Sequence, residues 1–116
     1  MNIRHKIWLE RNDKVVFGQG REKILEAIEE CNSLNAAAKK LQMSYRAAWA
    51  RLKASEERAG IKLVESHGMG KGLHLTPEAK ELLARFKKLE NEANALMEKF
   101  SPQFSLQEIK PDTKKN

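Results

Sequence analysis

Cysteine is nearly absent from this sequence, and proline and aromatic residues are scarce: 116 residues include one cysteine, three prolines and 6% aromatics. The lone Cys31 excludes an internal disulfide framework and is compatible with a reducing compartment. No apolar run approaches the ~20 residues of a membrane-spanning helix. Residues 1–10 are too short and too charged for a signal peptide. We therefore expect a cytoplasmic protein with no membrane attachment.

Residue types that build catalytic and metal sites are scattered along the chain. The histidines, His5, His67 and His74, lack metal-ligand spacing with Cys31. No serine or cysteine can be paired with a base by its spacing. The sequence therefore predicts no enzymatic activity, no metal site and no cofactor, and no small-molecule ligand is evident.

Basic residues outnumber acidic ones by 22 to 16, which gives a net charge of +6. On a small domain, such a balance favours a polyanionic partner, with nucleic acid first. The excess is concentrated between residues 34 and 75, where eight Lys or Arg and three Glu give about +5. Phosphate contact requires this kind of localised charge. A run of charged residues more often forms only a solvated face. The location of the positive excess is therefore a stronger argument than its total.

Hydrophobic periodicity predicts a mainly α-helical fold that begins with a β-hairpin. The predicted order is strands at 3–9 and 15–17, helices at 21–31, 33–41 and 44–59, strands at 62–66 and 73–75, and a helix at 76–100. Three short helices followed by a two-stranded wing are typical of a winged helix-turn-helix. We expect one domain over residues 1–100, including a long dimerisation helix at about 76–100, and a loose tail over residues 101–116.

The second and third predicted helices have the composition of a helix-turn-helix. Ala37 and Ala38 supply small side chains for a close helix crossing, and Leu41 and Met43 flank the turn. Gln42 occupies the turn position that is often glycine. The alternative interpretation is an ordinary alanine-rich helical hairpin without a DNA partner.

The third helix carries the side chains most suited to reading DNA. If Ala48 and Leu52 face the core, then Arg46, Trp49 and Lys53 point outward at 100° per residue. An arginine can donate two hydrogen bonds to guanine, and hydroxyl groups bind phosphates. Trp49 suits either the core or the DNA-facing side. The candidate DNA-binding residues are Ser33, Lys39, Ser44, Tyr45, Arg46, Trp49, Lys53, His67 and Lys71.

A glycine-rich loop joins the last two predicted strands. Gly68, Gly70 and Gly72 surround Lys71, but the loop is no Walker phosphate loop because no Ser or Thr follows the lysine. A wing tip is the better interpretation, in which glycines allow close approach and His67 or Lys71 meets phosphate or the minor groove. A mobile hairpin without contacts is the alternative.

The last helix has apolar residues in alternating steps of three and four, which is the seam of a coiled coil. Its first half can pack in the domain core. The apolar residues of its second half extend past the small core and need a partner surface to be buried, so we expect a homodimer. The expected dimerisation residues are Leu82, Phe86, Leu89, Ala93, Leu96 and Phe100.

The run Ser44-Tyr45-Arg46-Ala47-Ala48-Trp49, with Gly70-Lys71-Gly72 and Leu75-Thr76 downstream, resembles the N-terminal DNA-binding domain of the ModE family of molybdate-responsive transcription factors. The wider pattern is similar to LysR-type winged helices. This resemblance spans roughly residues 6–100. It implies a homodimer on palindromic double-stranded operator DNA, with the third helix reading the major groove. The chain ends about where the molybdate-binding domain would begin, so the expected regulator lacks molybdate sensing.

Two other functions remain open at this level. The chain could be a winged-helix protein–protein interaction module with no specific DNA target. It could also be a metabolite-responsive switch with a cavity in the dimer, although no residue argues for a ligand. Strongly salt-dependent DNA affinity with retained sequence preference would favour the regulator.

Overall fold

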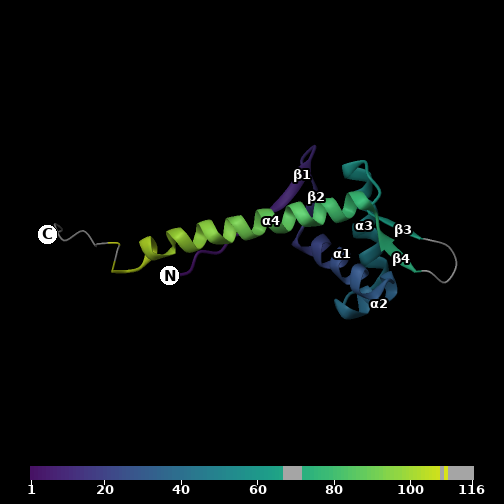
Figure 1. The fold of residues 1–116 in the computed structure, drawn as a ribbon, viewed down its shortest axis with the longest axis horizontal. Coiled ribbons are helices and arrows are strands. Elements are labelled where there is room, and N and C mark those ends of the chain that lie inside the picture. Colours follow the sequence, from purple (N-terminus) through teal and green to yellow (C-terminus); the bar gives the residue numbers. More distant parts are fainter. Residues whose placement is uncertain (67–71, 108, 110–116) are drawn as a thin grey trace. The chain divides into compact units, whose positions relative to one another are not determined.

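A computed structural model describes residues 1–66, 72–107 and 109 (Figure 1). Its elements are β1 (Trp8–Arg11), β2 (Lys14–Gly18), α1 (Gln19–Cys31), α2 (Leu34–Lys40), α3 (Tyr45–Ala59), β3 (Val64–Ser66), β4 (Leu73–Leu75), α4 (Pro77–Phe100) and the 3-10 helix η1 (Ser101–Phe104). The mainly helical fold and the predicted order of hairpin, three helices, second hairpin and long helix are confirmed. Over the described residues, none of the helices combines the length and apolarity needed to span a membrane.

The chain divides into two compact units. One unit, Ile7–Arg85, contains both hairpins, α1 to α3 and the start of α4. The other unit combines Met1–Lys6 with the chain from Phe86 onward. Each unit is held together by its own internal contacts.

The first hairpin is shorter than the sequence predicts. β1 begins at Trp8, so the strand expected over residues 3–7 is wrong. Trp8 already pairs with Gly18, the last residue of β2, and no strand continues beyond it to pair with residues 3–7. Asn12 and Asp13 form the turn with φ of 54° and 64°, which Asn and Asp tolerate better than other side chains.

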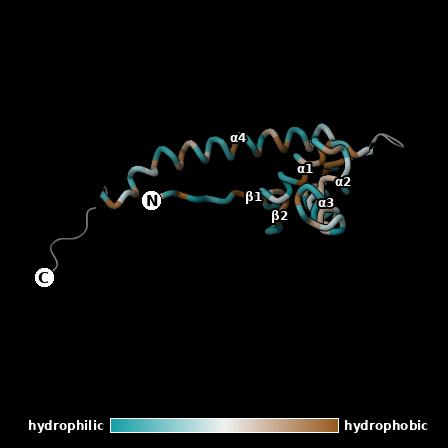
Figure 2. The backbone as a smooth tube through the Cα atoms, turned by 90° about the horizontal axis from the view of Figure 1, so that it is seen from below, coloured by the Kyte–Doolittle hydropathy of each residue, from teal (hydrophilic) through white to brown (hydrophobic). Residues whose placement is uncertain are grey.

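Helix α1 begins at Gln19, two residues before the predicted start, because Gly18 rather than Gly20 precedes its first turn. It ends at Asn32, which adopts the left-handed conformation, and the Asn32 N–H donates to the Ile28 carbonyl over 2.7 Å. The largest fully buried apolar side chains come from β2, α1, α3, the β3 approach and α4: Phe17, Ile24, Leu25, Ile28, Leu52, Leu63 and Phe86. Figure 2 shows hydrophobic residues gathered where α1, α2 and α3 meet.

The helix-turn-helix follows the local sequence signals closely. The Ser33 hydroxyl accepts a hydrogen bond from the Ala36 N–H over 3.1 Å, and the Ser44 hydroxyl accepts one from Ala47 over 3.0 Å. These bonds cap α2 and α3 and stabilise each helix start. Ala37, Ala38 and Ala48 are buried where α2 crosses α3. Gly60 ends α3 with φ of 73°, as expected of a helix-terminating glycine.

The turn between α2 and α3 contains a strained residue. Gln42 has φ of 57°, in the left-handed region that glycine adopts without steric cost. We expect Gln42→Gly to raise the free energy of unfolding by about 0.5–1 kcal/mol, the relief of strain less the added entropy of the unfolded chain. Urea unfolding at neutral pH measures the change. Gln19→Gly, at an exposed helical position, should instead destabilise the protein.

Helix α4 starts at the helix-capping signal Thr76-Pro77 that the sequence contains. The Thr76 hydroxyl accepts from the Ala79 N–H over 3.0 Å and donates to the Lys62 carbonyl over 2.7 Å, so it caps α4 and ties its start to the β3 approach. Hydrophilic and hydrophobic residues alternate along the whole helix in Figure 2. Ala79 and Leu83 are buried. The first turns of α4 therefore belong to the core of the Ile7–Arg85 unit.

Candidate nucleic-acid interface

Helix α3 presents a mixed aromatic and basic face to solvent. Tyr45 and Trp49, one helical turn apart, are 52% and 40% exposed, and Arg46 is exposed beside them. Ala48 and Leu52, on the adjoining side of the helix, are fully buried. The orientation of α3 expected from helical periodicity is therefore the one that the structure has.

The two capping serines, Ser33 and Ser44, keep a free donor. Each hydroxyl oxygen accepts from a backbone N–H, so its hydrogen remains available to a further acceptor. A phosphate oxygen is such an acceptor. Both hydroxyl groups can therefore cap a helix and still donate to a further acceptor.

A shallow groove of about 300 Å³ lies between α3, the start of α2 and the start of β4. Ser33 and Asn35 from the start of α2, Tyr45 and Trp49 from α3, and Gly72 before β4 line it. The fold thus brings Ser33 together with Tyr45 and Trp49, which lie more than ten residues away in sequence. This groove is a surface of polar donors and aromatic faces.

Lys53 is less free than the sequence suggests. Its ammonium pairs with the Glu56 Oε1 at 3.1 Å and lies 4.4 Å from the centre of the Trp49 ring. A cation over an aromatic face is weakly attracted to it. The charge of Lys53 is thus partly compensated within α3, whereas Lys39 is exposed at the end of α2.

Glu56 is the residue at this site that sequence reasoning missed. Its carboxylate is buried and accepts hydrogen bonds from the backbone N–H of Leu63 over 2.7 Å and of Val64 over 3.4 Å. Burial raises the pKa of Glu56, but the hydrogen bonds from Leu63, Lys53 and Val64, with the Lys53 charge, outweigh burial and hold the pKa below its ordinary value. This carboxylate therefore fastens the start of β3 to α3. The available sequence signal for this role was an acidic residue within a helix that is rich in Lys and Arg.

Gly72 lets the wing approach the end of α1. Its φ is +74°, and a Cβ built there would lie 2.4 Å from the Asn32 carbonyl oxygen. That same oxygen accepts a hydrogen bond from the Leu73 N–H over 3.0 Å. Only glycine combines this conformation with this contact. The wing residues His67 and Lys71, predicted to contact DNA, lie outside the described residues.

We expect Gly72→Ala to lower the free energy of unfolding by about 1–3 kcal/mol, because alanine is strained at this φ and its methyl group meets the Asn32 carbonyl. Thermal or urea unfolding measures the loss. Gly20→Ala provides the matched control, since a Cβ at Gly20 meets nothing within 4 Å. Equal effects of the two substitutions would show that the Asn32 contact is not needed.

The predicted dimerisation residues divide between buried and exposed positions. Phe86 is 2% exposed, whereas Leu89, Leu96 and Phe100 are 42%, 48% and 40% exposed within this chain. Leu82 and Ala93 are intermediate. The exposed part of the seam therefore begins at Leu89.

The N-terminal segment Met1–Lys6 lies along the second half of α4. His5 Nε2 hydrogen-bonds to Asn94 Oδ1 over 2.8 Å, and the Ser101 hydroxyl donates to the Met1 carbonyl over 3.3 Å. The sequence pattern placed residues 3–6 in a strand and contained no signal for this helix contact. The segment is held by side chains instead of a β-ladder.

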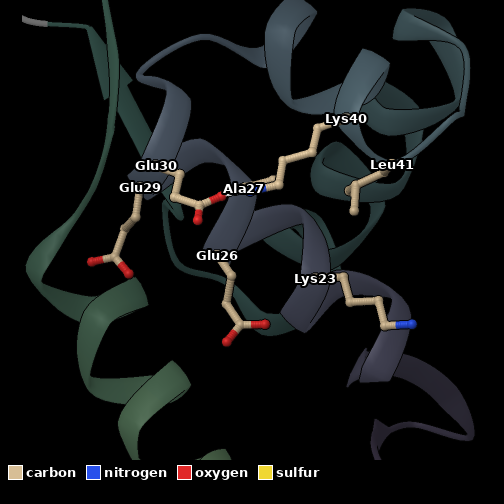
Figure 3. A pocket seen from close by; sticks show the side chains of 7 residues that line it. All are labelled: Lys23, Glu26, Ala27, Glu29, Glu30, Lys40 and Leu41. Atoms are coloured by element: carbon tan, nitrogen blue, oxygen red, sulfur yellow. Dashed lines mark ion pairs between the residues drawn. The ribbon is translucent and has the colours of Figure 1, made fainter.

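A second groove, of about 480 Å³, lies on α1 and the end of α2 (Figure 3). Its walls carry charges of both signs, including Glu26, Glu29 and Lys23, and Lys40 forms an ion pair with Glu30. This mixed-charge surface does not extend the basic face of α3. Over residues 1–66, 72–107 and 109, no group of three His, Cys, Asp or Glu side chains is placed to hold a metal ion.

Comparisons with known proteins agree with this geometry. Residues 22–80 match the family model of bacterial regulatory helix-turn-helix proteins of the lysR family. The chain is 37% identical over 73 residues to the transcriptional regulator ModE of Haemophilus influenzae, an alignment that covers 60% of this chain and 29% of that protein. The chain thus spans less than a third of the length of this relative.

Solved structures show the same fold. The CbnR DNA-binding domain in complex with DNA superposes with a TM-score of 0.60 at 22% identity, covering 74% of this chain and 97% of that one. The BenM DNA-binding domain bound to benA site 1 DNA gives 0.58 at 22% identity, over 74% of this chain and 98% of that one. The predicted winged helix-turn-helix is therefore confirmed.

Proposed function

Because this chain belongs to the lysR family of bacterial regulatory helix-turn-helix proteins, we propose that it is a sequence-specific transcriptional regulator. It binds palindromic operator DNA as a homodimer and places α3 in the major groove. The observation that carries this proposal is the exposure of Tyr45, Arg46 and Trp49 on α3, whose Ala48 and Leu52 are buried in the core. Two similar solved domains are DNA complexes, which supports the proposal.

The exposed side chains of α3 have distinct roles in this proposal. Arg46 forks onto the O6 and N7 acceptors of guanine, the commonest specific contact in the major groove. Trp49 packs its apolar ring against a thymine methyl group. Tyr45, Ser44 and Ser33 donate to phosphates and fix the register of the helix on the duplex.

We expect Arg46→Ala to weaken operator binding by about 1–3 kcal/mol for each half-site and to flatten the base preference at one position of each half-site. Selection of bound sequences from a random duplex pool first identifies the operator, and titration of matched single-base variants then measures the preference. Arg85→Ala, which removes an exposed arginine from α4, should leave the preference intact.

The titration separates several outcomes. An equal loss of affinity on every duplex would reassign Arg46 to a phosphate contact. If the unmodified protein binds no duplex even at low salt, the proposed regulator function fails and the winged-helix protein interaction module becomes the better assignment.

The proposed homodimer uses the exposed part of the α4 seam. Leu89, Leu96 and Phe100 repeat at coiled-coil spacing, and a two-fold partner presents the same stripe, so both copies are buried at once. Palindromic sites require two reading helices about 34 Å apart, one turn of DNA. A two-fold dimer supplies that symmetry.

A further inference from the structure

Three arginines lie together on the edge of α3 that faces away from Trp49. Arg51 and Arg58 lie two turns apart on α3, and Arg51 follows Trp49 by about 200° around the helix. Arg21, in the first turn of α1, reaches the same edge, because its Nε donates to the Ser55 hydroxyl over 2.9 Å. We call Arg21, Arg51 and Arg58 the arginine edge.

Neutral acceptors hold the arginine edge in place. Arg21 is bound to a buried serine hydroxyl, and Arg58 Nη1 donates to the Val15 carbonyl over 2.7 Å. Hydroxyl and carbonyl oxygens position a guanidinium without cancelling its charge. Arg51 is exposed. The edge therefore presents fixed positive charge to solvent.

The three charges are close enough to repel one another. Burial, followed by the charges of Arg58 and Arg51, lowers the pKa of Arg21 below that of an ordinary arginine. Such repulsion costs stability in the free protein, and an anion placed against the edge relieves it. Arginine is also the side chain best suited to phosphate, because its planar fork donates two parallel hydrogen bonds.

Basic residues of the first hairpin extend this surface. Arg11, Lys14 and Arg58 line a shallow groove of about 420 Å³, together with Asn12, Gly60 and the acidic Glu57. Arg11 Nη1 donates to the Ala59 carbonyl over 2.9 Å, so it too is held by a neutral oxygen. Arg21 and this hairpin lie outside residues 22–80, where the family model matches.

We propose that the arginine edge is a second phosphate-binding surface, which grips the DNA strand opposite the one bound by Ser33, Ser44 and Tyr45. The inference rests on the proposed function, with α3 in the major groove. That groove is about 12 Å wide and a helix with its side chains about 10–12 Å across. Opposite edges of α3 therefore face the phosphates of the two strands.

Arg51→Gln tests the proposal, because Arg51 is exposed and has no hydrogen bond or ion pair to another element among the residues that the structure describes. Binding to the selected operator and to an unrelated duplex should weaken by the same factor, and the slope of log affinity against log salt should decrease by about two per dimer, one for each protomer. Within each half-site, phosphate ethylation should cease to interfere with binding at positions on one strand only. Arg85→Gln removes the same charge from α4 and should change neither readout.

The outcomes distinguish the inference from the function on which it rests. If the unmodified protein selects an operator but Arg51→Gln leaves the salt slope and the ethylation pattern unchanged, the arginine edge is off the DNA and the inference is wrong while the regulator stands. If no duplex is bound by the unmodified protein, both are wrong. The inference would also be wrong if Arg51→Gln removed a base preference instead of lowering the affinity for all duplexes equally.

Discussion

Replacing both Leu89 and Leu96 by lysine should give a folded monomer whose operator affinity falls by about a hundredfold or more. Each leucine is more than two-fifths exposed in the single chain, at 42% and 48%, so the substitution should leave the monomer folded. In a two-fold dimer, however, each large side chain contributes about 1.5–3 kcal/mol when buried, and both copies are lost. Without the dimer, two half-sites can no longer be bound as one event.

Sedimentation equilibrium and operator titration measure the two effects of this double substitution. Asn91→Lys with Ala95→Lys adds the same charge to exposed positions on the other side of α4 and should preserve both the dimer and the affinity. Half-site affinity should be similar for all three proteins. The dimer proposal is wrong if the unmodified chain is already monomeric at micromolar concentration.

Glu56→Ala should lower the free energy of unfolding at pH 7 by about 2–4 kcal/mol. The substitution removes a carboxylate that accepts from the Leu63 and Val64 N–H groups and from Lys53. Hydrogen bonds to charged groups contribute about 1.5–3 kcal/mol, and a buried N–H left without an acceptor costs a similar amount. Glu57→Ala, at an exposed neighbour, should change stability by less than about 0.5 kcal/mol.

The effect of Glu56→Ala should also depend on pH. Folding lowers the pKa of Glu56, so its ionised form stabilises the protein fully above the pKa of the unfolded chain, near 4.5. This contribution is lost as the pH falls through the lower pKa of the folded state. Urea unfolding at pH 7 and at pH 3 should therefore show a large and then a small difference between the two proteins. A constant difference would mean that the Glu56 charge is not involved.

Elements with local signals could be predicted closely from the sequence. The bounds of α3 follow from Ser44 and Gly60, which act on residues within one turn of themselves. Helix α4 follows equally from Thr76 and Pro77. By contrast, the alternation over residues 3–7 describes a strand only if a partner is available, and β2 ends at Gly18. Strand pairing is a tertiary property that alternation alone does not contain.

The candidate site likewise combines features that local sequence signals predict with features that depend on tertiary contacts. Periodicity was sufficient to place Arg46 on the exposed face of α3, because that depends only on which side is buried. The contact of Gly72 with Asn32 joins residues forty positions apart, and the bond from Leu63 to Glu56 depends on how β3 returns to α3. A residue's type does not reveal which distant backbone group it will meet.

The clamp between the first hairpin and the C-terminal end of α3 has a consequence for local unfolding. Arg11 donates to the Ala59 carbonyl, and Arg58 donates back to the Val15 carbonyl. The last turn of a helix ordinarily frays, since its final carbonyls lack partners. Here those carbonyls are held by a segment nearly fifty residues away, so we expect the hairpin and the end of α3 to open as one cooperative unit. Amide hydrogens at Gly60 and in β2 should therefore exchange with solvent through a shared opening, with a common free energy.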